Sequence, residues 1–232
     1  MKKVLALLFL SVYVSTSIFA EDPTDKNFHF GLKATPGLFW VNNGGDKTVT
    51  NNGMAFGFGY GLITEFKLAD NYGFATGVEI AGMGGKFTQV TTITTGTVST
   101  NVNDKEALKL QYIQIPLTLK MKTKMIGSMK YFGQFGLNLG INTKASTNNA
   151  ITVGSLAAVE KNDEDVKKYI NPIRLALMVG AGVEYNLSGS TSAVMSAHFD
   201  NGFLNTIKKD SDKGYTTKAL VKGIVITVGI LF

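Results

Sequence analysis

Residues 54–67, with the sequence MAFGFGYGLITEFK, alternate large apolar side chains with glycine and other small or polar residues. Successive side chains of an extended strand point to opposite faces, so this period of two predicts a β-strand. One face carries the aromatic rings, whereas the other is nearly bare and sparsely charged. The water-facing side of a soluble sheet is normally polar, but the interior of a narrow barrel needs small residues. The stretch therefore favours a barrel wall whose aromatic face meets lipid.

The same alternation recurs along the rest of the chain. The expected strands span about residues 28–41, 54–67, 72–81, 108–122, 131–141, 174–185, 193–200 and 223–232. Pro36 interrupts the first strand and predicts a bulge or a bend there. The fourth strand changes phase near Tyr112 and Pro116, which a β-bulge would explain.

The links between these strands alternate strictly in length. Long links cover about residues 42–53, 91–106, 145–170 and 201–217, and short links cover about 69–71, 124–128 and 188–189. Short turns on one side and long loops on the other are typical of outer-membrane barrels. The expected fold is all-β: an eight-stranded antiparallel up-and-down transmembrane β-barrel with both ends on the periplasmic side. In the longest link, apolar spacing predicts a short surface helix over about residues 155–169.

The first 20 residues have the features of a secretory signal peptide. Lys2 and Lys3 are followed by an apolar core, and Ala20 precedes an acidic pair at a plausible cleavage point. The alternative is an uncleaved anchor helix, which the short apolar core disfavours. The expected organisation is a signal peptide over 1–20, a short N-terminal lead over 21–27 and a barrel over 28–232. The expected location is the bacterial outer membrane.

Composition agrees with a barrel in a membrane. The chain is 44% hydrophobic and only 17% charged, with 26 glycines and no cysteine. A soluble domain usually carries about 25% charged residues. The mature part has no run of roughly 18 apolar residues that could form a spanning helix. The net charge of +6 is spread thinly along the chain, which argues against nucleic-acid binding and allows contact with anionic lipid head groups.

Several charged side chains fall on the small-residue faces and are expected to point into the lumen. These candidates for a polar lumen network are Lys33, Glu65, Lys67, Glu79, Lys120, Arg174, Glu184 and His198. Charges of both signs in a narrow interior can pair and neutralise one another. We therefore expect a self-filled lumen without a porin-size channel. The alternative is that these side chains lie at the ends of the barrel, in water and unpaired.

The sequence contains no convincing catalytic or metal site. Ser196, His198 and Asp200 alternate along one strand face and form a formal Ser/His/Asp set. Residues on one strand do not automatically reach the hydrogen-bonding geometry of a triad, so polar contacts in the lumen are the better interpretation. Two distant histidines without cysteine do not make a metal site, and no cofactor is expected.

The last residues carry an assembly signal. Phe232 is preceded by Ile230 and Val228 at spacings of two, the pattern that many outer-membrane barrels present to their assembly machinery. The expected partners are therefore outer-membrane lipid, the barrel assembly machinery and other envelope or secretion proteins.

Five stretches together resemble the PorT-like outer-membrane β-barrel family of Bacteroidetes. They are residues 30–34, 112–120, 131–136 and 180–184, and the closing Phe232. The most specific is the Tyr-x-x-Ile-Pro-Leu strand at 112–117. This resemblance implies an eight-stranded barrel in the outer membrane. The founding member of that family is linked to protein secretion, although most relatives have no assigned activity.

Four hypotheses for the function follow. The first is a structural or interaction barrel that is not an enzyme and whose outer loops face the environment. The second is an accessory barrel for protein secretion, as the resemblance implies. The third is a lipid-modifying outer-membrane enzyme, which the weak nucleophile disfavours. The fourth is a secreted soluble β-sandwich, which the glycine-rich faces and sorted loops disfavour.

Overall fold

The computed structural model describes residues 27–43, 49–95, 98–153, 159–208 and 218–232. The expected signal peptide and nearly all of the expected N-terminal lead lie outside these residues. Within the described residues, no helix has both the length and the hydropathy of a membrane span.

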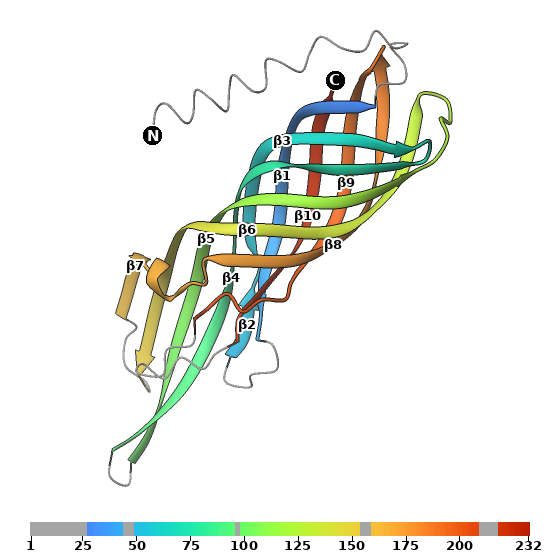
Figure 1. Cartoon of the computed structure of the whole chain (residues 1–232). Helices are drawn as coiled ribbons and strands as arrows, with labels where there is room; N and C mark the ends of the chain where they lie inside the picture. The colour runs from blue at the N-terminus through green and yellow to red at the C-terminus, as the bar shows by residue number, and fades with distance from the viewer. Residues whose placement is uncertain (1–26, 44–48, 96–97, 154–158, 209–217) are drawn as a thin grey trace, which may run out of the picture.

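Eight strands form a closed antiparallel barrel (Figure 1). They are β1 (Phe28–Asn42), β3 (Ala55–Ala69), β4 (Tyr72–Thr95), β5 (Val98–Lys122), β6 (Met129–Val153), β8 (Ile173–Ser188), β9 (Thr191–Gly202) and β10 (Leu220–Leu231). Each strand pairs with the next along the chain, and β1 pairs with β10 to close the ring. The predicted fold class is therefore confirmed.

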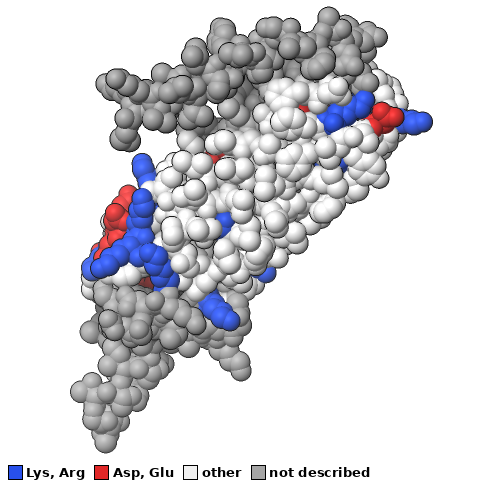
Figure 2. Space-filling model, in the orientation of Figure 1, with Lys and Arg blue, Asp and Glu red and all other residues white. Residues whose placement is uncertain are grey.

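Apolar side chains cover the outside of the barrel wall. Phe56 and Leu62 of β3 point outward and are 71% and 54% exposed, whereas Gly57 and Gly59 between them are buried. The outer surface is largely uncharged, and the charged side chains gather toward its two ends (Figure 2). Such a band can be stable only against hydrocarbon, because water would strongly disfavour so much exposed apolar surface.

Three strands are much longer than a membrane requires. β4, β5 and β6 contain 24, 25 and 25 residues, while a tilted transmembrane strand needs only about 9–11. Their far halves continue beyond the ring, where β2 (Val49–Gly53) joins β4 and β7 (Val159–Asp165) joins β6 (Figure 1). We call this part the extension. The opposite end, which carries the short turns, is the turn end.

The structure corrects two expectations about the long links. The predicted helix over 155–169 is wrong, because its described part contains strand β7 and only a single 3-10 turn, η1 (Lys167–Tyr169). The reason is that β8 leaves β6 beyond Ile141, and β7 then pairs with β6 from Ser146 to Ile151. The link predicted at 91–106 is mostly a continuation of β4 and β5, since its threonines and valines favour extended backbone.

The short turns follow the sequence, whereas the expected bulges do not. The turn at Asp70 and Asn71 is confirmed, and the turn after β8 uses Gly189 at φ 55°, a conformation that glycine adopts without strain. The bulge expected in the fourth strand near Tyr112 is wrong: β5 keeps its alternation, and the extra residue is Thr143 of β6, opposite the step from Gln111 to Tyr112. Pro36 causes no register shift, although the ladder to β10 is interrupted beside it because proline lacks an N–H.

Candidate functional site

Four charged side chains form a closed cluster inside the barrel near the turn end. Lys120 Nζ lies 2.8 Å from Glu65 Oε2 and 2.9 Å from Glu184 Oε1. Lys122 Nζ lies 2.7 Å from Glu184 Oε2 and also pairs with Glu65. Each lysine therefore bridges both carboxylates, and the cluster is neutral. We call it the turn-end cluster.

The turn-end cluster crosses the lumen between strands that are not neighbours. β5 supplies both lysines, while β3 and β8 supply the carboxylates. Lys120 is only 1% exposed, and its Nζ also lies 4.3 Å from the centre of the Phe132 ring. A buried ammonium is stable only with such partners. The cluster thus blocks this part of the lumen with its own side chains.

Two further groups of charges follow toward the extension. Lys33 pairs with Glu79, which also accepts a hydrogen bond from the Thr35 hydroxyl. Next, Arg174 pairs with Asp200 and donates a hydrogen bond to the Val221 carbonyl at 3.2 Å. These ion pairs are also largely shielded from water.

Amide side chains extend the Arg174–Asp200 pair across the lumen. Asn138 Nδ2 donates to Asp200 Oδ2 at 3.2 Å and to Gln114 Oε1 at 3.1 Å. The bond to the Asp200 carboxylate is charge-assisted, and such bonds are stronger than neutral ones. The three groups together hold the basic Lys33, Lys120, Lys122 and Arg174 against the acidic Glu65, Glu79, Glu184 and Asp200. The charges of these three groups therefore cancel.

The structure brings six of the predicted lumen residues into these ion pairs and places two apart from them. Lys67 contacts the exposed Asp70 at the rim of the turn end, 3.5 Å away. His198 is buried between the charged groups but joins no ion pair. Sequence reasoning missed Lys122 as a partner, although its spacing of two from Lys120 on the same strand was the available signal.

Ser196, His198 and Asp200 do point into the lumen together, since all three are buried on β9. However, His198 Nδ1 has no hydrogen-bond partner, and Asp200 is occupied by Arg174 and Asn138. Two small cavities of about 30 and 40 Å³ border His198. The side chains therefore do not stand in a Ser/His/Asp relay, and each cavity has room for little more than water.

An apolar layer closes the lumen on the extension side of the charges. Its buried side chains include Phe39, Val41, Met83, Phe87, Leu108, Leu110, Tyr112, Val221 and Val225. Ile170, which follows η1, belongs to the same core and pairs with Ile207 as an isolated bridge. We call this layer the apolar plug. Sequence reasoning expected small and polar residues here and missed it.

One ring of the apolar plug depends on glycine in both flanking strands. Phe39 of β1 lies against Gly57 of β3 and Gly223 of β10, and a Cβ at either glycine would overlap the ring. Glycine leaves the space that the ring fills, a known pairing of aromatic and glycine residues in sheets. Some of the small inward residues therefore make room for a large side chain.

Inside the extension, Glu106 titrates near neutral pH. Partial burial raises the pKa of Glu106 to about 7, with further contributions from the carboxylates of Asp104 and Glu164. Above this pH the three carboxylates repel one another, and below it Glu106 is neutral. The pairing of β5, β6 and β7 in the extension should therefore be sensitive to pH.

We expect Glu106→Gln to stabilise the extension at pH 8 but not at pH 4.5. Because the pKa of Glu106 is raised in the folded extension, local stability is highest at low pH and falls as pH rises toward 7. The gain at pH 8 should be on the order of 2 kcal/mol in opening free energy. Amide hydrogen exchange along β5 and β6 measures this opening free energy, after correction for the pH dependence of the intrinsic exchange rates. Glu160→Gln on the exposed β7 is the matched control, and an equal gain for both variants would contradict the assignment.

The residues of the expected assembly signal lie on the outer wall at the turn end. Phe232, Ile230 and Val228 are 40%, 44% and 51% exposed. The Phe232 ring packs against Phe30 with centroids 5.7 Å apart. Among the described residues, no group of histidine, cysteine or carboxylate side chains could hold a metal ion.

Comparisons with known proteins agree with this architecture. A family model described as outer membrane protein beta-barrel domain matches residues 19–220. No protein of curated function matches the sequence.

Solved structures of similar fold share little sequence with this chain. Neisserial surface protein A is 10% identical, with a TM-score of 0.42, over 89% of this chain and 96% of that one. OprG from Pseudomonas aeruginosa is 14% identical, with a TM-score of 0.38, over 91% and 98%. A major outer membrane protein from Thermus thermophilus is 11% identical, with a TM-score of 0.45, over 89% and 100%.

Proposed function

Because the chain belongs to the outer-membrane β-barrel domain family, we propose that it is a closed barrel with a structural or interaction role in the bacterial outer membrane. The turn end faces the periplasm and the extension faces outward, as in barrels with short periplasmic turns. The observation that carries the proposal is the filled lumen, with its neutral ion pairs and apolar plug. Such an interior offers no porin-size path, so we place the function on the outer surfaces, which can contact other molecules.

The extension is the natural place for an interaction. The outer halves of β4, β5 and β6 project beyond the length that a bilayer covers, and β2 and β7 widen this sheet. A barrel with a purely mechanical role has no need for such a projection. The proposed partners of this protein are outer-membrane lipid and other envelope proteins. The barrel assembly machinery is proposed to act at Phe232 during insertion.

Shortening the β4–β5 hairpin tests this role. Thr88 pairs with Lys105, so residues 89–104 can be replaced by an Asn-Gly turn without changing the register below. We expect the barrel to fold and shift on gels as before, whereas crosslinks to envelope partners in intact cells should fall by more than half. Unchanged crosslinks would contradict the proposal. In a control variant, a Gly/Ser segment of equal length replaces residues 89–104. This control distinguishes the effect of losing the sequence from the effect of shortening the hairpin.

A second candidate is an accessory role in protein secretion. The similarity of residues 112–120 and 180–184 to the PorT-like family favours it. Deleting the gene and measuring exported proteins distinguishes the two roles, because loss of secretion without loss of crosslinks would favour the accessory role.

We further propose that the chain is not an enzyme. Support comes from the occupied Asp200 and the unpartnered His198 Nδ1 beside Ser196. Unchanged lipid and ester hydrolysis by a Ser196→Ala variant is the expected result.

A further inference from the structure

The outward-facing charges of the barrel strands are all of one sign. Along the described parts of the eight strands, the outward positions carry no aspartate or glutamate. Their charged residues are Lys86, Lys105, Lys109, Lys144 and Lys222. The acidic residues of these strands are on inward positions, where most of them pair with lumen cations. This sorting leaves a surface that attracts anions.

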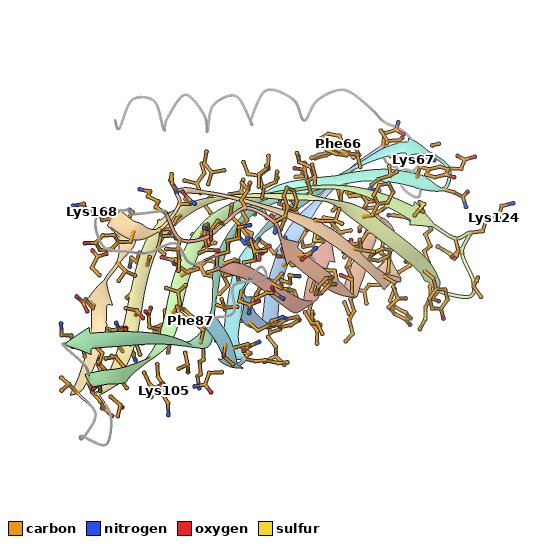
Figure 3. The ribbon with its side chains drawn as sticks, turned by 90° about the horizontal axis from the view of Figure 1, so that it is seen from below. Phe66, Lys67, Phe87, Lys105, Lys124 and Lys168 are labelled. Atoms are coloured by element: carbon orange, nitrogen blue, oxygen red, sulfur yellow. The ribbon has the colours of Figure 1, made fainter. Side chains whose placement is uncertain are left out.

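Four of these lysines are neighbours on β4, β5 and β6. Lys86 is opposite Ala107, which lies between Lys105 and Lys109 on β5. Lys144 is opposite Gln111, the next outward position after Lys109. Diagonal neighbours on adjacent strands lie about 7–8 Å apart. We call Lys86, Lys105, Lys109 and Lys144 the lysine patch, and Figure 3 shows Lys105 pointing away from the wall at the extension end.

The lysine patch begins where the apolar band ends. Ile113 and Ile141 face each other across β5 and β6 and are 39% and 59% exposed. The next outward pair beyond them contains Lys144, and Lys86 comes after the small outward residues Gly82 and Gly84 of β4. Lysine at this level can keep its stem on apolar surface while its ammonium reaches the head groups. The patch therefore lies at the level of the outer-leaflet head groups.

Nearby carboxylates neutralise only part of the lysine patch. Lys109 pairs with Asp163 of β7 at 3.0 Å. Glu160 lies in the same row as Lys105 but two strands away, roughly 10 Å. Lys86, Lys105 and Lys144 make no ion pair with any described residue. Three ammonium groups are therefore available to a ligand.

A hollow beside two of these lysines can hold a sugar. It has a volume of about 250 Å³, and its lining includes the outward residues Lys86, Lys105, Asn148 and Glu160 together with Asn52 of β2. Asparagine amides and carboxylates bind hydroxyl groups, whereas lysine binds phosphate. This combination of groups suits a phosphorylated sugar better than a phosphate alone.

We propose that the lysine patch and this hollow bind the phosphorylated sugar head group of an anionic glycolipid in the outer leaflet. The phosphates contact Lys86, Lys105 and Lys144, the sugar hydroxyls contact the amides, and the acyl chains lie along the apolar wall below Ile113. This site rests on the proposed orientation, in which the extension faces outward, but not on the proposed interaction with other proteins.

The test is a titration of the detergent-folded barrel with diphosphorylated lipid A, with inorganic phosphate as a second probe. The triple variant Lys86→Gln/Lys105→Gln/Lys144→Gln should bind the glycolipid about a hundredfold more weakly, because each of the three surface lysines contributes about a fivefold factor. Lys109 is retained so that its pair with Asp163 holds β7 in place. The matched control, Lys124→Gln/Lys130→Gln/Lys161→Gln, should bind like the unmodified protein.

Two further measurements make the result decisive. The triple arginine variant at 86, 105 and 144 should retain binding, and 0.5 M salt should weaken binding to the unmodified protein. Gel mobility before and after boiling verifies that every variant is folded. Equal binding by the glutamine variant and the unmodified protein would overturn the proposal. Binding of inorganic phosphate as tightly as the glycolipid would also overturn it, because the sugar and the membrane would then contribute nothing.

Discussion

Replacing Lys120 with methionine should lower the free energy of unfolding by about 3–5 kcal/mol, the usual cost of breaking a buried ion pair from one side. Lys120 is 1% exposed and bonded to both Glu65 and Glu184. Without it, two buried carboxylates share the single ammonium of Lys122, and one negative charge has no counterpart. Denaturant unfolding of the barrel in lipid vesicles, followed by gel mobility, measures the loss.

A second substitution separates lost charge from lost packing. In the Lys120→Met background, Glu65→Gln removes the excess charge and leaves Glu184 paired with Lys122. The double variant should therefore be more stable than the sum of the two single changes by about 1–2 kcal/mol. Lys124→Met in the exposed turn is the control and should leave stability almost unchanged. Strictly additive effects would show that the turn-end cluster does not act as a unit.

Phe39→Ala should have an effect of similar size, about 3–5 kcal/mol, because it opens a cavity in the apolar plug. The Phe39 ring is 3% exposed and lies between two glycines in the flanking strands. Neighbouring backbone cannot collapse into the space, since closed strand pairing holds β3 and β10 in place. The same unfolding experiment in vesicles provides the measurement.

Gly223→Ala provides the reciprocal test of this contact. In the unmodified protein the new methyl group meets the Phe39 ring, and we expect a loss of about 1–3 kcal/mol from overpacking. In the Phe39→Ala background the ring is gone, and the same methyl group should cost little or recover some stability. A loss of equal size in both backgrounds would show that the ring does not set the requirement for glycine at 223.

The strands and their faces could be predicted because both are local properties. Alternation in residues 54–67 placed the apolar side chains outside and the glycines inside, as found for Phe56 and Gly57. Loop lengths gave the number of strands. The helix expected over 155–169 was wrong, because a free edge of β6 decided that segment and local spacing could not reveal it.

The pairing of the lumen charges could be anticipated only in outline. Strand phase showed that Lys120 and Glu65 point inward, but their contact joins β5 to β3 across the lumen, with β4 between them. Such contacts depend on register, tilt and barrel width together, none of which a single strand encodes. The partners of Lys120 therefore had to come from the structure.

The apolar plug was hidden for a different reason. Around Phe39, residues 37–41 read GLFWV, so both faces of the strand are apolar and a period of two cannot show which face is inside. Leu108 and Leu110 have the same inward phase as Tyr112 and Gln114, whereas a change of phase near Tyr112 was expected from the sequence. The side chains of the apolar plug come together, on the extension side of the charged groups, only when the strands close into a ring.

Thiol accessibility tests most directly whether the lumen is sealed and the outer wall faces lipid. The chain has no cysteine, so single variants can be labelled in proteoliposomes. Ser196 is buried in the lumen, its neighbour Ala197 faces outward, and Ser128 lies in an exposed turn. Each is replaced by cysteine and exposed to a charged, water-soluble thiol reagent or to a lipid-soluble maleimide.

Ser128→Cys should react with the water-soluble reagent, Ala197→Cys only with the lipid-soluble one, and Ser196→Cys with neither. Rapid reaction of Ser196→Cys with the charged reagent would mean that water fills an open channel. Rapid reaction of Ala197→Cys with it would mean that the outer wall faces water rather than lipid.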